Sequence, residues 1–137
     1  MSEDLPDTDA ARREAGMRTR REVLGNAHVD RAVANTTPFT AGFQDFITRV
    51  AWGDVWQRPG LTRRERSIAT LSTTVALRHW DEFALHVRAA VANGLTDDDI
   101  AEVLQHAAVY AGVPAANHAF AVAGPILAEL RAGTSED

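Results

Sequence analysis

The chain has 137 residues, a length that fits one domain with its own hydrophobic core. Its 45% hydrophobic and 24% charged residues are typical of a globular protein, and its net charge of -5 makes nucleic acid an unexpected partner. Cysteine is absent, which excludes disulfides, thiol nucleophiles and iron–sulfur clusters. All 14 basic residues are arginine, so a lysine Schiff base is excluded as well.

Both ends of the chain are polar and lack a periodic pattern. We expect flexible tails at residues 1–9 and 132–137, flanking a single helical domain at residues 10–131. The first ten residues are acidic and have no apolar core, unlike a signal peptide. No segment approaches the roughly 20 apolar residues of a membrane span. The expected location is therefore the cytoplasm, with no membrane partner.

Two helices are predicted in the first part of the chain. Residues 10–24 form an arginine-rich amphipathic pattern. Residues 38–56 read as a second helix, in which four apolar side chains recur at helical spacing. We expect these four to point inward: Phe43, Phe46, Ile47 and Val50.

Four more helices are predicted between residues 62 and 130. One begins at the capping-box pattern of Thr62 and ends near residue 78, and the next stops at Asn93 and Gly94. A third begins at the capping box of Thr96 and ends at Gly112, and the last runs from Pro114 towards residue 130. Because no segment shows sustained strand alternation, the prediction is an all-α fold of about six helices.

A glutamate and a histidine lie four residues apart in the fourth predicted helix. Glu82 and His86 therefore share one helix face, where the carboxylate could orient the imidazole as a proton donor or acceptor. A surface ion pair without catalytic function has the same spacing. The residues by themselves leave both interpretations open.

Further polar side chains accompany the last two predicted helices. His106 and Tyr110 lie four apart on a helix flank, a position from which polar groups can face a cleft between helices. Structural residues at the edge of the core would look the same. Asn117 follows a segment of small residues, which would permit either close substrate approach or tight helix packing.

Metal and nucleotide sites have little support. His79, Glu82 and His86 would lie on one face only if a helix ran unbroken through Trp80, but a helix boundary is predicted there. We therefore predict no metal site. No glycine-rich phosphate-binding motif and no nucleophile-elbow motif occurs either.

From about residue 20 to residue 130 the chain resembles the carboxymuconolactone decarboxylase family. The matching stretches include residues 106–117, HAAVYAGVPAAN, a block typical of the true decarboxylase branch. The other stretches are Val23 to Gly25 with His28 and Val29, Thr37 to Gln44, Trp52 to Trp56, Arg58 to Leu61, and Leu85 to Ala90.

The resemblance implies an alkylhydroperoxidase D-like helical fold that assembles as a ring-shaped homo-oligomer, a trimer or hexamer, and needs no cofactor. The reductases of the wider family use a Cys-x-x-Cys motif. In this chain the two cysteine positions fall on His79 and Glu82, and the preceding glutamate position falls on Ser67. Dithiol reduction of peroxides is therefore excluded here.

The reaction implied is decarboxylation of a lactone, γ-carboxymuconolactone, to β-ketoadipate enol-lactone and CO2, in the protocatechuate branch of aromatic catabolism. Such chemistry needs an acid, oxyanion donors and cations for carboxylates. On this hypothesis His86 is the proton donor and Glu82 orients it. The remaining assignments are His106 and Tyr110 as oxyanion donors, Arg66 or Arg88 as the carboxylate clamp, and His79, Trp80 and Asn117 as further pocket residues.

Two alternatives stay open at this point. A member of the same family could act on a different carboxylated lactone. The other alternative is a non-catalytic helical assembly module, in which the histidines are structural. The positions of the side chains distinguish it from an enzyme, because a catalytic His86, His106 and Tyr110 should face one site.

Overall fold

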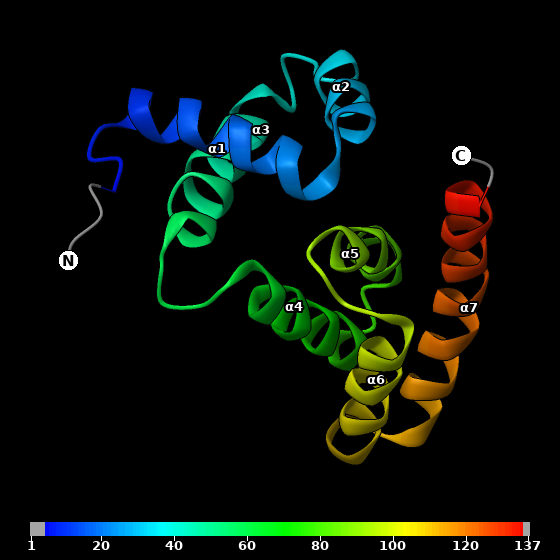
Figure 1. Ribbon diagram of the computed structural model, residues 1–137. Coiled ribbons are helices and arrows are strands. Elements are labelled where there is room, and N and C mark those ends of the chain that lie inside the picture. The colour runs from blue at the N-terminus through cyan, green and yellow to red at the C-terminus, as the bar shows by residue number, and fades with distance from the viewer. Residues whose placement is uncertain (1–4, 136–137) are drawn as a thin grey trace. The chain divides into compact units, whose positions relative to one another are not determined.

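The computed structural model describes the backbone of residues 5–135 and the side chains of residues 5–133. Seven α-helices and no strand occur in this range, which confirms the all-α prediction and adds one helix to it (Figure 1). The chain divides into two compact units, residues 1–62 and 63–137. The single domain expected over residues 10–131 stays a prediction, and residues 1–4, 136 and 137 of the expected tails lie outside the described residues.

Residues 5–62, the described part of the first unit, contain three α-helices and two short irregular helices: α1 (Asp9–Leu24), α2 (Asn26–Ala34), α3 (Ala41–Ile47), a π-helix (Thr48–Trp52) and a 3₁₀ turn (Val55–Gln57). The Thr8 side chain caps α1 by accepting a hydrogen bond from the N–H of Ala11. Gly25, at φ 88°, separates α1 from α2. The sequence patterns miss α2, because among its nine residues only Val29 is buried.

Two glycines allow α1 to pack directly against the π-helix. A Cβ atom on Gly16 would collide with the carbonyl oxygen of Thr48, and one on Gly53 would collide with the carbonyl oxygen of Arg12. Only hydrogen atoms fit between the two backbones at this crossing. The crossing therefore depends on glycine at both positions.

The helix predicted over residues 38–56 is interrupted, and part of its expected inner face is wrong. Phe43 and Phe46 are 63% and 51% exposed. The polar side chains of Gln44 and Thr48 face α1 instead. The buried guanidinium of Arg20 donates hydrogen bonds to Thr48 Oγ1 at 3.2 Å and to Gln44 Oε1 at 3.0 Å. A buried cation needs such acceptors, and meeting that need turns the two phenylalanines outward.

In the second unit, residues 63–135 form four helices: α4 (Arg63–Leu77), α5 (Trp80–Ala92), α6 (Asp97–Ala111) and α7 (Val113–Ser135). The predicted capping box of α6 is confirmed, with Thr96 Oγ1 accepting from the N–H of Asp99 at 3.1 Å. Gly112 ends α6 at φ 102°, as predicted. The last helix continues past residue 130, through Pro125, to Ser135.

These four helices enclose one hydrophobic core. Both α5 and α6 pack against α4 and α7, so that α5 and α6 lie diagonally across the core. Phe83, Leu71 and Leu104 are fully buried there, and α7 contributes a row of alanines that includes Ala119. Small side chains on α7 let it pack closely against its neighbours. No helix among the described residues is both long enough and apolar enough to cross a membrane.

Candidate active site

The turn between α4 and α5 positions several candidate residues. Helix α4 ends in a Schellman motif, in which the N–H of Arg78 donates to the Val75 carbonyl at 3.1 Å and the N–H of His79 donates to the Thr74 carbonyl at 2.9 Å. Arg78 adopts the left-handed backbone conformation, with φ 57°. Helix α5 then begins at Trp80, so the helix boundary predicted between His79 and Asp81 is confirmed.

Glu82 and His86 lie on the same face of α5, as their spacing predicts. The distance from Glu82 Oε2 to His86 Nε2 is 3.9 Å. The histidine side chain is 8% exposed and the glutamate side chain 63% exposed. The pair therefore joins a buried imidazole to a carboxylate in solvent, an arrangement that can orient the ring and relay a proton outward.

Aromatic contacts fix the side chain of Trp80 at the start of α5. Its ring meets Phe83 edge-on, with centroids 5.8 Å apart, and it packs against the ring of His118 on α7 at 4.4 Å. These contacts hold Trp80 between the core and the surface. A hollow of about 550 Å³ lies beside it, lined by Arg78, His79, Trp80, Asp81 and Glu82.

His106 and Tyr110 lie on α6 with their ring centroids 5.2 Å apart. They line a second hollow of about 380 Å³, to which α4 contributes Ser72, Thr73 and Ala76. The predicted pair of polar side chains therefore does face a groove between two helices. His86 is not among the residues that line this groove.

The two arginines proposed as carboxylate clamps differ in their surroundings. Arg88 donates to Glu129 on α7 at 2.9 Å, and at 100° per residue it lies about 200° round α5 from His86. Arg66 is half-buried on α4. Because Arg66 lies on α4, the angular separation from His86 that counts against Arg88 on α5 does not apply to it. Asn117 is exposed on α7.

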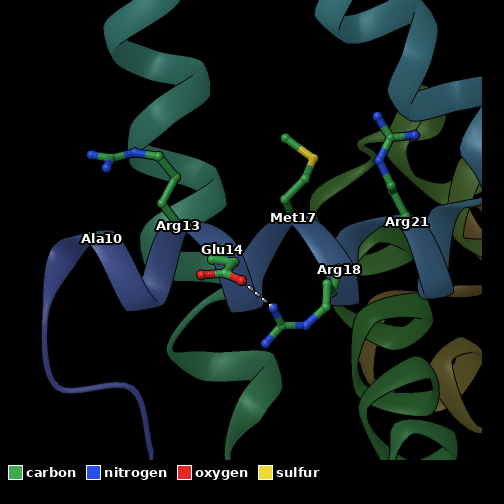
Figure 2. A pocket seen from close by; sticks show the side chains of 6 residues that line it. All are labelled: Ala10, Arg13, Glu14, Met17, Arg18 and Arg21. Carbon is green, nitrogen blue, oxygen red and sulfur yellow. Dashed lines mark hydrogen bonds and ion pairs between the residues drawn. The ribbon is translucent and has the colours of Figure 1, made fainter.

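Cations also line a groove in the first unit, along one face of α1. This hollow has a volume of about 580 Å³ and is lined by Arg13, Arg18 and Arg21. Figure 2 shows the three side chains on α1. Each guanidinium has a carboxylate partner, and these partners are Asp45, Glu14 and Asp30 respectively. The groove therefore offers little uncompensated charge to an anion.

Over residues 5–133 no group of three or more histidine, aspartate and glutamate side chains is arranged to hold a metal ion. The sequence patterns do not single out Arg78, which lines the same hollow as Glu82. Its one signal is its position directly after a predicted helix, where glycine or asparagine is usual.

The described residues are helical and bring a buried histidine next to a glutamate, and the chain has no cysteine. The sequence profile of the Carboxymuconolactone decarboxylase family matches residues 41–124. The chain belongs to the carboxymuconolactone decarboxylase family. Within the classes of enzyme it is a decarboxylase, that is, a carboxy-lyase.

Three relatives illustrate this membership. The 4-carboxymuconolactone decarboxylase of Acinetobacter baylyi is 43% identical over 122 residues, which cover 89% of this chain and 91% of the relative. The nitrosuccinic acid decarboxylase npaB of Metarhizium robertsii is 44% identical over 124 residues, covering 89% and 87%. A 4-carboxymuconolactone decarboxylase sequence from Pseudomonas putida is 54% identical over 43 residues, covering 31% of this chain and 90% of that sequence.

Proposed function

We propose that the chain removes CO2 from 4-carboxymuconolactone (γ-carboxymuconolactone) and gives β-ketoadipate enol-lactone. This reaction belongs to the protocatechuate branch of aromatic catabolism. The observation that carries this proposal is the 43% identity to the Acinetobacter baylyi enzyme over nearly the whole of both chains. The pair of Glu82 and His86 supports it, because the reaction needs an oriented proton donor.

In the proposed reaction the substrate supplies its own electron sink. The carbon–carbon bond to the ring carboxylate breaks, and its electron pair moves through the ring double bond onto the lactone carbonyl oxygen. Protonation of the carbon next to that carbonyl then gives the enol-lactone. One proton is consumed and one CO2 is released, so the balance requires neither an oxidant nor a cofactor.

The proposed roles follow from this scheme. Protonated His86 delivers the proton, and Glu82, 3.9 Å away, orients the imidazole and stabilises its charged form. His106 and Tyr110 line a different groove from the Glu82 and His86 pair, so they can donate hydrogen bonds to the developing oxyanion only where a second copy of the chain brings its groove to that pair. Between Arg66 and Arg88, Arg66 is the better candidate for the carboxylate clamp, because Arg88 pairs with Glu129 on the other side of α5.

A second candidate substrate is nitrosuccinate, which the 44% identity to the Metarhizium robertsii enzyme favours. The chemistry is parallel, since loss of the carboxylate beside the nitro group would leave the electron pair on the nitro oxygens. The same acid would then protonate the carbon. Both candidate substrates carry a second carboxylate that remains in the product, so both need a cation in the site.

The proposal includes assembly as a ring-shaped homo-oligomer, a trimer or a hexamer. Three large side chains near the His106 groove support an interface there: Val109 is 77% exposed, Tyr110 80% and Val113 70%. Neighbouring apolar side chains with this exposure are typical of surfaces that another protein covers. A second copy of the chain is the partner expected.

An assay of the purified protein with both substrates tests the proposed function. We expect CO2 release from 4-carboxymuconolactone, together with loss of its ultraviolet absorbance. The volume-conserving substitution His86→Gln should lower kcat by about 10²- to 10⁴-fold, because positioned acid catalysis contributes that much. Glu82→Gln should lower it less and alter the pH profile, since it acts through the histidine.

The matched control is Glu102→Gln, which changes an exposed glutamate on α6 and should leave turnover intact. Circular dichroism establishes that each variant is folded. Near-normal turnover by folded His86→Gln would refute the role of His86. CO2 release from nitrosuccinate but not from the lactone would replace the first substrate by the second.

A further inference from the structure

Arg78 occupies a backbone position that ordinarily belongs to glycine. Helices α4 and α5 both end in a Schellman motif, and the left-handed residue of that motif is Gly94 after α5 but Arg78 after α4. Their φ angles are 98° and 57°. A side chain with a Cβ atom makes this conformation less favourable. An arginine here therefore costs stability that a glycine would not.

The guanidinium of Arg78 also lacks an ion-pair partner among the described residues. Other exposed arginines of the second unit differ in this respect. Arg64 pairs with Asp99 at 3.2 Å, Arg88 with Glu129 at 2.9 Å, and Arg131 with Asp97. Arg78 thus keeps its full charge and its hydrogen-bond donors for something outside the chain.

The surroundings of Arg78 indicate what that ligand is. It is the permanent cation among the side chains lining the hollow of about 550 Å³ at the start of α5. Glu82 lines the same hollow and belongs to the pair with His86. Asp81 and Glu82 carry negative charge there and oppose the entry of an anion, and Arg78 is the group that offsets this charge.

We propose that Arg78 binds the substrate carboxylate that remains in the product. This inference rests on the proposed function of the Glu82 and His86 pair, and it places the retained carboxylate at Arg78 in place of Arg66 or Arg88. The planar guanidinium can hold a carboxylate through two parallel hydrogen bonds. A carboxylate held in this hollow lies beside Trp80 and Glu82.

The test uses the full chain and separates charge from backbone strain. Arg78→Gly removes the guanidinium and relieves the strain, so its melting temperature should equal or exceed that of the unsubstituted protein. Arg78→Gln removes only the charge, and Arg78→Lys keeps it. Arg31→Gln is the matched control, because Arg31 is exposed on α2 and also lacks an ion-pair partner among the described residues.

Two readouts are measured: KM for the turned-over carboxylated substrate, and the Kd of succinate by calorimetric titration without turnover. We expect both constants to rise at least about tenfold in Arg78→Gly and Arg78→Gln, with kcat less affected. Arg78→Lys should recover part of the binding. Asp81→Asn should tighten succinate binding by removing a repulsive charge from the hollow, and Arg31→Gln should change neither constant.

Succinate that binds Arg78→Gly as tightly as the unsubstituted protein, or binds neither protein, overturns the proposal. A lower melting temperature together with an unchanged KM would show that Arg78 is structural. The proposed function and this inference fail in different measurements. Full turnover by His86→Gln would refute the catalytic role of His86, but it would not change how succinate binding depends on Arg78.

Discussion

Asp45 accepts hydrogen bonds from two arginines of the first unit. Arg13 on α1 and Arg49 in the π-helix donate to it, the latter through Nε at 2.7 Å. These hydrogen bonds, that from Arg13 first, lower the pKa of Asp45 from 3.8 to about 2. A carboxyl group whose pKa is lower in the folded state stabilises that state above its unfolded pKa, and the contribution is lost as the pH falls towards the folded value.

Asp45 should therefore make unfolding sensitive to acid between about pH 4 and pH 2. Urea unfolding at a series of pH values measures this dependence. Asp45→Asn should lower stability at pH 7 and flatten the loss below pH 4, because the amide has no charge to lose. The control Asp7→Asn changes an exposed residue before α1. An equal loss of stability in Asp45→Asn and the unsubstituted protein would contradict this account.

At the same scale the candidate site could be predicted only in part. The spacing of Glu82 and His86 is sufficient to place them on one helix face, as observed. The sequence does not reveal that the histidine is buried while the glutamate is exposed, because that depends on the helices packed against α5. The left-handed conformation of Arg78 is equally hidden, since arginine is an unexpected residue there.

At the scale of elements, the contact between α1 and the π-helix explains why the inner face predicted for the helix over residues 38–56 is partly wrong. Apolar periodicity over residues 38–56 favours a regular helix with Phe43 and Phe46 inward. The contact itself depends on Gly16 and Gly53, and on polar acceptors for the buried Arg20. Periodicity does not register glycine contacts or hydrogen bonds to a buried cation, so it assigns the wrong inner face.

Gly16→Ala should destabilise the protein by about 1–3 kcal/mol or more, because the new methyl group would overlap the carbonyl oxygen of Thr48 and backbone cannot move aside cheaply. The free energy of unfolding in urea measures this change. Gly42→Ala is the matched control, since α3 leaves open space at that residue and alanine favours a helix. Equal stability of the two variants would show that the close crossing is absent in solution.

At the scale of the whole molecule, contacts within one chain do not explain why several apolar and aromatic side chains on α6 and α7 are exposed. Val109, Tyr110 and Val113 are apolar or aromatic and lie mostly in solvent. The proposed homo-oligomer would cover them. It would also enclose the groove that His106 and Tyr110 line.

The double substitution Val109→Glu with Val113→Asp should reduce the molar mass measured by light scattering after size-exclusion chromatography. Placing several negative charges in a contact between copies costs far more than placing them in water. Val113 stands at the first residue of α7, where an acidic side chain suits the helix, so the fold should persist. Ala128→Asp, at an exposed position of the same helix, is the control. An unchanged mass in the double variant would exclude this surface as the interface.

The sequence by itself determines the helical class, most helix boundaries and the family. Helical periodicity, capping residues and sequence identity to relatives all depend only on the order of the residues. Tertiary structure alone decides which face of each helix is buried, why α2 exists, and where Arg78 and His86 lie. Those features arise from contacts between residues distant in the chain, such as Arg20 with Thr48 or Arg88 with Glu129. Their free energy depends on positions in space that a one-dimensional pattern does not contain.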